Sequence, residues 1–150
     1  MSPAAKPADG AIWWGRELFK TGPDLDQPCP EAIDVTGSMR VLVFGPMLIL
    51  PAGPWRLAAR FALTAEAARN PFILQFIHGQ DLAEQTFRPT GPGAYEVALE
   101  TSFGLDAVAA LRLWLGRAAF HGELRFQGAS VQRPAGYDPA SGSPDKGAAA

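Results

Sequence analysis

Histidines and acidic residues are the side chains of this sequence that could act as catalysts or metal ligands. The two histidines, His78 and His121, stand in the segments HGQD (78–81) and HGE (121–123). Each has a carboxylate nearby, but neither has another type of ligand at the spacing that metal sites use. We interpret both as turn histidines beside hydrogen-bonding acids, and we expect no metal site and no cofactor.

The acidic residues offer no better catalytic arrangement. Asp24 and Asp26 lie in a proline-rich loop, without a nucleotide-binding pattern around them. Glycoside hydrolysis needs two carboxylates about 5–10 Å apart across a cleft, whereas Glu96, Glu100 and Glu123 fall on outward positions of expected strands. The sequence also contains no Gly-x-Ser-x-Gly elbow, no phosphate-binding glycine loop and no His-Glu-x-x-His motif. We therefore expect that the protein is not an enzyme.

Trp114 is the residue whose position most favours ligand binding. In AALRLWL (109–115) it is out of phase with three leucines, so it points to the opposite face of the expected strand. A large aromatic ring on the polar side of a strand is typical of recognition surfaces, and such a ring can stack on the C–H face of a sugar. Polar residues of the same outward parity complete our candidate ligand-binding set, which is Trp114, Arg112, Arg60, Arg56 and His121.

The alternation leaves two questions about this set open. Parity does not say to which of two sheets a residue belongs, so the outward arginines need not converge. The alternative interpretation of Trp114 is that the N-terminal arm covers it, forming a satellite cluster with Trp13 and Trp14.

A period of two dominates the chain between residues 32 and 133 and predicts half-buried antiparallel strands. The strongest examples are PWRLAARFAL (54–63), AYEVALET (94–101), AALRLWL (109–115) and AFHGELRF (119–126). In the last of these, the alternation places Phe120, Leu124 and Phe126 on the inward face. FILQFIH (72–78) is apolar on both faces, as a central strand would be.

Turn-forming segments such as PAGP, RNP and PTGPG separate these strands, in a chain with 14 prolines and 16 glycines. Short strands separated by such turns predict an all-β fold, an antiparallel two-sheet β-sandwich of jelly-roll type. Helix formers in 64–69 and 103–115 allow a competing helical interpretation of those two stretches. The strand interpretation fits 103–115 better, because a helix would leave Leu113 and Trp114 off its apolar face.

The composition divides the chain into one domain and its flanks. Residues 1–10 and 134–150 are rich in Pro, Gly, Ala and Ser, and we expect a disordered N-terminus and a disordered C-terminal tail. Residues 11–31 carry too many large apolar groups for a free tail, so we expect a packed arm and loop, in either a strand or a short helix. Residues 32–133 form the expected β-sandwich domain.

Charge and cysteine content limit the partners and the compartment. The 13 basic and 15 acidic residues give a formal net charge of −2, so we expect no nucleic-acid partner. The longest apolar run, 41–50, is shorter than the ~20 residues that span a bilayer, and the N-terminus does not resemble a secretory signal. The single cysteine, Cys29, stands between two prolines and is expected to be an exposed, unreactive loop thiol. We expect a soluble, cytoplasmic protein with no membrane partner.

The stretch GPMLILPAGPWRL (45–57) predicts two strands joined at a proline-rich corner, with Trp55 buried as its anchor. Together with residues 33–61 and ELRFQGASVQR (123–133), it resembles bacterial β-sandwich modules of the carbohydrate-binding, galactose-binding type, found beside glycosyltransferases in polysaccharide systems. Their pattern is Gly-Pro-aromatic, a few apolar residues, Leu-Pro-x-Gly and a basic-aromatic pair. The sequence departs from this pattern at Met47, where an aromatic is usual, and at Pro54, where a basic residue is usual.

The resemblance implies a non-catalytic binding module for glycans that works beside enzymes of polysaccharide or glycan synthesis. If Met47 or Pro54 stands where the family touches its ligand, that contact is lost here. The alternative function is a protein–protein interaction or homo-oligomeric assembly domain without a sugar site. The oligomeric state stays open at this level.

Overall fold

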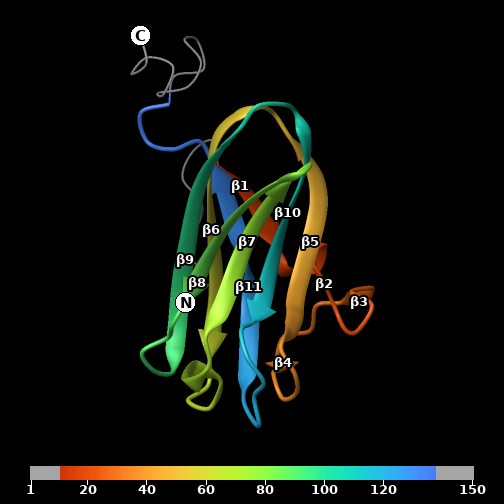
Figure 1. Cartoon of the computed structure of the whole chain (residues 1–150), viewed down its shortest axis with the longest axis vertical. Coiled ribbons are helices and arrows are strands. Elements are labelled where there is room, and N and C mark those ends of the chain that lie inside the picture. Colours follow the sequence, from red (N-terminus) through yellow and green to blue (C-terminus); the bar gives the residue numbers. More distant parts are fainter. Residues whose placement is uncertain (1–10, 138–150) are drawn as a thin grey trace.

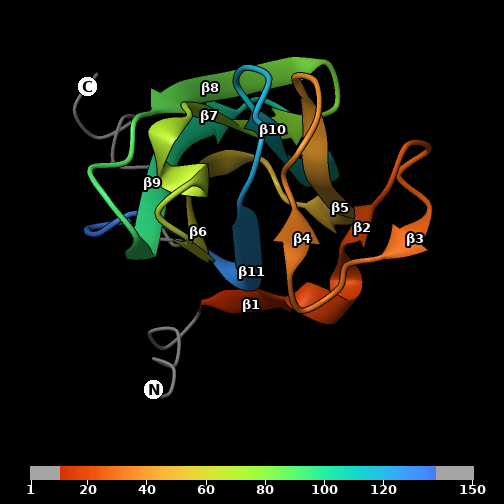
Figure 2. The same ribbon diagram turned by 90° about the horizontal axis from the view of Figure 1, so that it is seen from below.

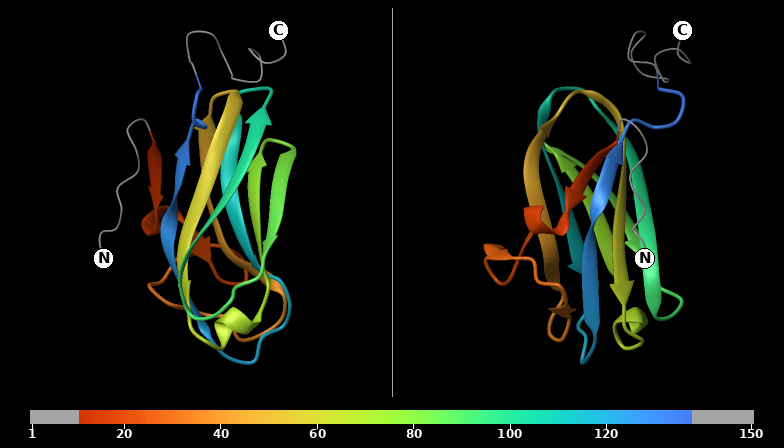
Figure 3. Two further views of the ribbon diagram at one scale, coloured as in Figure 1. Left: turned by 90° about the vertical axis from the view of Figure 1, so that its left-hand side faces the viewer. Right: turned by 180° about the vertical axis from the view of Figure 1, so that it is seen from behind.

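Two antiparallel sheets packed face to face form the protein, which a computed structural model describes over residues 11–137 (Figures 1 and 3). The elements are β1 (Ile12–Gly15), η1 (Arg16–Leu18), β2 (Lys20–Thr21), β3 (Gln27–Pro28), β4 (Ile33–Asp34), β5 (Arg40–Leu50), β6 (Gly53–Leu63), η2 (Ala67–Arg69), β7 (Phe72–His78), β8 (Asp81–Phe87), β9 (Gly93–Phe103), β10 (Ala107–Leu115) and β11 (Glu123–Gln132). This architecture confirms the prediction of an all-β, two-sheet sandwich. The disorder expected for residues 1–10 and 134–150 lies outside the described residues except at 134–137, which form a turn where the N–H of Tyr137 donates to the carbonyl oxygen of Pro134 at 3.1 Å.

The long strands alternate between the two sheets along the chain. Sheet A has the order β1-β11-β6-β9, with β4 also pairing to β11, and sheet B has the order β3-β2-β5-β10-β7-β8. From β5 onward only the β7–β8 hairpin stays within one sheet, so every other connection crosses between the layers. The left view of Figure 3 shows the two layers side by side, with β6, β9 and β11 in one and β5, β10, β7 and β8 in the other.

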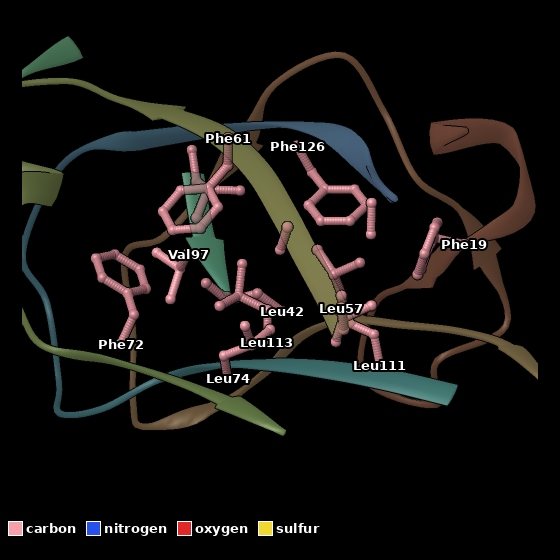
Figure 4. Close-up of a cluster of buried hydrophobic side chains, with 14 of the residues drawn as sticks. Phe19, Leu42, Leu57, Phe61, Phe72, Leu74, Val97, Leu111, Leu113 and Phe126 are labelled. Carbon is pink, nitrogen blue, oxygen red and sulfur yellow. The ribbon is translucent and has the colours of Figure 1, made fainter. Parts of the chain in front are cut away.

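The core lies between the sheets and is built from the inward residues of each strand. Leu57 and Phe61 of β6 face Leu111 and Leu113 of β10 across the sandwich (Figure 4). Each fully buried side chain of this size contributes about 1.5–3 kcal/mol to folding. The alternation read from residues 54–63 therefore identifies the inward face correctly.

The N-terminal arm is a strand followed by a single turn of 3₁₀ helix. β1 pairs with β11, which buries Trp14 in the core and leaves Trp13 on the outer face of sheet A. Of the two ambiguous stretches, 103–115 contains strand β10, and 64–69 contains the 3₁₀ turn η2. The helical interpretation is thus wrong for the first, because inter-sheet packing of its leucines decides the conformation.

The proline-rich corner carries the chain from β5 in sheet B to β6 in sheet A. Trp55 is buried, as predicted, and its Nε1–H donates a 2.8 Å hydrogen bond to the carbonyl oxygen of Pro51. The guanidinium of Arg133 lies 4.0 Å over the indole ring. Just before the corner, β5 bulges, because Pro46 and Leu48 pair with consecutive residues of β10, and the intervening Met47 adopts a φ of 65° with its side chain exposed.

Cys29 is buried, with 7 % of its surface exposed, so the prediction of an exposed thiol is wrong. Its backbone N–H donates to the carbonyl oxygen of Phe19 at 3.2 Å, and this bond holds the loop that contains Cys29 against the N-terminal arm. Burial raises the pKa of the thiol above its usual 9.0, and the charge of Arg16 offsets this only in part.

We expect Cys29 to react with iodoacetamide at least about tenfold more slowly in the folded protein than in urea, because the thiolate is the reactive form. Folding disfavours the thiolate, so the free energy of unfolding should fall as the pH rises above about 9.0. Alkylation followed by mass spectrometry measures the rates, and equal rates with and without urea would contradict the burial.

Candidate functional site

Three connections meet at one end of the sandwich and line two adjoining surface hollows. They are the β4–β5 loop, the β6–β7 loop that contains η2, and the β10–β11 loop, all at the lower end of Figure 1 and facing the viewer in Figure 2. Gly37 and Ala119 exchange two backbone hydrogen bonds of 2.8 Å, and Gly116 donates to the carbonyl oxygen of Pro71 at 2.8 Å. These bonds hold the loops in fixed positions relative to one another. We call this region the loop end.

Phe120 is the most exposed large apolar side chain at the loop end, with 86 % of its surface open to solvent. The prediction that it faces the core is wrong, because β11 begins only at Glu123. The intervening Gly122 has a φ of +123°, a backbone conformation that L side chains rarely adopt, and it breaks the alternation. A β-carbon at Gly122 would also lie 2.5 Å from the backbone nitrogen of Ala67. The chain therefore turns sharply beneath an uncovered aromatic ring.

A hollow of about 480 Å³ lies beside Phe120 and is lined mainly by polar side chains. Arg117 is fixed on its wall, since its guanidinium donates to the carbonyl oxygen of Arg69 at 2.7 Å and to Oδ1 of Asn70 at 3.5 Å. Asn70 is itself buried and donates to the carbonyl oxygen of Ala67 at 3.3 Å. The hollow thus combines an exposed ring with positioned hydrogen-bonding groups. Its charged or titratable lining residues are Glu66, Arg69, Arg117 and His121.

A second hollow of about 370 Å³ adjoins the first and shares Glu66 and His121 with it. Asp34 lines it, and hydrogen bonds from Thr36 hold the pKa of its carboxyl below 3.8, with smaller contributions from the charges of Arg40 and His121. Asp34 is therefore ionised at neutral pH. The two adjoining hollows together present both donors and a carboxylate acceptor, and the Phe120 ring lines the first of them.

The five residues predicted to bind ligand lie in three separate places. His121 belongs to the loop end. Arg56 and Arg60 lie on the outer face of sheet A, where they form ion pairs with Glu100 at 3.7 Å and Glu96 at 3.0 Å.

Trp114 and Arg112 lie on the outer face of sheet B, on β10. The indole Nε1–H of Trp114 donates to Oε1 of Gln75 at 2.8 Å. The alternative interpretation, in which Trp114 forms a cluster with Trp13 and Trp14, is wrong, because β1 belongs to the other sheet.

His78 is part of the core. It stacks on Phe103, with ring centroids 3.7 Å apart, and its Nε2 lies 3.2 Å from the carbonyl oxygen of Leu50. Its hydrogen-bonding partner is thus a backbone carbonyl, and the acid that we expected from HGQD does not fill this role. Across residues 11–137, no group of three His, Cys, Asp or Glu side chains is placed to hold a metal ion.

Sequence reasoning missed Phe120 and the charged residues around η2. The signal that could have found Phe120 is the glycine two positions later, which separates it from the strand that follows. Glu66, Arg69 and Arg117 carry no local signal, because only the tertiary fold brings the two loops together. In the described part of the chain, no helix reaches the length and hydrophobicity required to cross a membrane.

Solved structures with the same architecture include modules that bind carbohydrate. TmCBM61, whose structure was determined in complex with β-1,4-galactotriose, superposes with a TM-score of 0.51 and 13 % identity over 84 % of this chain and 90 % of that chain. This chain has the fold of a carbohydrate-binding module. The CBM36-1 domain of a multidomain xylanase from the hindgut metagenome of Trinervitermes trinervoides gives a TM-score of 0.50 and 9 % identity over 83 % of this chain and 98 % of that one. No protein-family model and no curated protein matches the sequence. At such identities the likeness extends to the fold of the module and not to the residues of a binding site.

Proposed function

We propose that the protein is a non-catalytic carbohydrate-binding module whose glycan site is the loop end. The observation that carries the proposal is the Phe120 ring, 86 % exposed beside a polar hollow of about 480 Å³. Exposing a ring of this size to water is unfavourable, and the packing of the sandwich gives no reason for it. A sugar supplies the matching surface, because its axial C–H groups stack on an aromatic face while its hydroxyls need donors and acceptors at the edge.

The polar groups of the loop end suit the hydroxyl groups of a sugar. Arg117 is held by the backbone of the β6–β7 loop, so it can donate to a ligand without first losing side-chain freedom. Asp34 stays ionised and can accept, and His121 lies between the two hollows. The binding of galactotriose by TmCBM61, a module of the same fold, supports this chemistry. From the resemblance of its sequence, we expect the module to work beside enzymes of polysaccharide or glycan synthesis.

We expect Phe120→Ala to weaken glycan binding by about tenfold or more, because the stacking surface is lost while the fold is kept. Isothermal titration of a panel of neutral and acidic oligosaccharides first identifies the ligand. The same titration with Phe120→Ala and His121→Ala then measures the loss.

The matched control is Leu105→Ala, which removes an apolar side chain that is 77 % exposed in the β9–β10 connection, at the opposite end of the sandwich. It should bind as the wild type does. Absence of heat with every glycan would overturn the proposal. So would binding that Phe120→Ala leaves unchanged but that Trp114→Ala abolishes, since this would move the site to the outer face of sheet B.

A further inference from the structure

The outer faces of the two sheets differ in character. On sheet A, β6 and β9 carry ion pairs such as Arg60 with Glu96. On sheet B, the outer face of β10, β7 and β8 is mainly apolar and holds one cation and one carboxylate. We call it the nine-residue face. Its members, in three rows across the strands, are Trp114, Ile73 and Thr86; Arg112, Gln75 and Glu84; and Ala110, Ile77 and Leu82.

Hydrogen bonds link Trp114 of the first row to Gln75 and Glu84 of the middle row, while Arg112 beside Gln75 has an unsatisfied nitrogen. Gln75 accepts from the indole of Trp114 at 2.8 Å and donates from Nε2 to Oε1 of Glu84 at 2.7 Å. On the other side of Gln75, the Nε of Arg112 is shielded from solvent and has no hydrogen-bond partner within residues 11–137. No carboxylate in that range forms an ion pair with Arg112 either. A shielded Nε without an acceptor is costly, and Arg112 as a whole is only half-buried, so the rest of its cationic guanidinium can still attract an incoming carboxylate.

We propose that the nine-residue face binds a second copy of this chain. The two-fold axis lies in the interface, directly above the outer face of β7 and parallel to that strand. Rotation about such an axis exchanges the positions of β10 and β8 and keeps each row opposite itself. Arg112 then faces Glu84 of the second copy, and Glu84 faces Arg112 of the second copy, so two ion pairs form. Ile73 and Ile77 lie on the axis and face their own equivalents, which buries the apolar centre of the face.

Side-chain size agrees with this arrangement as well as charge does. In the first row, the large Trp114 faces the small Thr86 of the second copy. In the third row, the small Ala110 faces Leu82, whose side chain is 52 % exposed in the single chain. Two sheets can pack in this way because twisted sheets stack face to face at about 10 Å. An axis along β10 instead would place Arg112 against Arg112, which opposes association.

The face is smaller than the standard interface of 20–30 residues a side, so we expect a weak dimer with a Kd of roughly 1–100 µM. Sedimentation equilibrium of the full chain between ~1 and ~500 µM should show a monomer–dimer equilibrium. Arg112→Glu and Glu84→Arg should each weaken dimerisation by at least about tenfold, because each places like charges opposite each other. The double variant, with the charges exchanged, should recover most of the wild-type affinity.

Arg125→Glu is the matched control, since it makes the same charge change on the outer face of sheet A and should leave the Kd unchanged. Glu84 is exposed, so Glu84→Arg gives a folded test protein even if Arg112→Glu does not fold. A monomer at all concentrations overturns the proposal, as does a dimer that neither reversal weakens. The glycan titration is a separate readout, because Phe120 lies outside this face. A monomer whose glycan binding depends on Trp114 would show that the face holds a sugar and not a second copy.

Discussion

Gly128→Ala is expected to lower the free energy of unfolding by about 2–5 kcal/mol, one of the two largest single-site effects that we expect in this protein. Gly128 lies at a bulge in β11, where the pairing register to β6 shifts between Phe126 and Gly128. Its φ is +135°, and a β-carbon there would lie 2.5 Å from the carbonyl oxygen of Trp14 and 2.7 Å from the ring of Trp13. Strain in β11 and a clash with β1 therefore act together.

Urea denaturation measures this loss as a lower midpoint at an unchanged m value. Gly104→Ala is the control, because a β-carbon at Gly104 meets no atom within 4 Å. We expect it to change the free energy of unfolding by less than about 0.5 kcal/mol. Equal midpoints for the two variants would contradict the close approach of β1 to β11.

Phe61→Ala should destabilise the fold by about 3–5 kcal/mol, because it empties the centre of an aromatic cluster. Phe61 is 1 % exposed, and its ring centroid lies 5.9 Å from that of Phe87, 6.2 Å from that of Phe72 and 6.4 Å from that of Tyr95. These neighbours belong to strands of both sheets, so the cavity cannot close without moving one sheet against the other.

The same chemical change at Phe120 is the control for this prediction. Phe120→Ala removes an equal volume from an exposed position and should alter the free energy of unfolding by less than about 0.5 kcal/mol. Thermal or urea unfolding of both variants makes the comparison. A large loss at Phe120 would show that its ring supports the fold, and it would remove the main argument for a glycan site at the loop end.

The fold could be predicted from the sequence where local alternation and tertiary burial agree. β6 shows this most clearly, since Leu57 and Phe61 face the core while Arg56 and Arg60 face solvent. Alternation fails where a strand does not extend through the pattern. AFHGELRF alternates over eight letters, but the turn at Gly122 interrupts it, and Phe120 points outward.

The candidate site was harder to predict than the fold, because it depends on pairings between distant segments. Parity assigns Trp114 and Arg60 correctly to outward positions, yet they lie on opposite layers of the sandwich. The loop end joins Glu66 to His121 through backbone hydrogen bonds between loops that are far apart in the sequence. No local pattern in the sequence predicts that these two loops lie side by side.

The pairing of β1 with β11 has a consequence for how the chain is made. The first strand of the described residues lies at the edge of sheet A, and its only neighbour there is the last strand. During synthesis, the backbone of β1 therefore has no native strand partner until residues 128–131 have left the ribosome. Sheet A closes only at that moment, because β11 also fills the place between β1 and β6. We expect nascent chains stalled before β11 to expose apolar surface and to need chaperones, whereas release of the complete strand closes the sandwich in one late, non-local step.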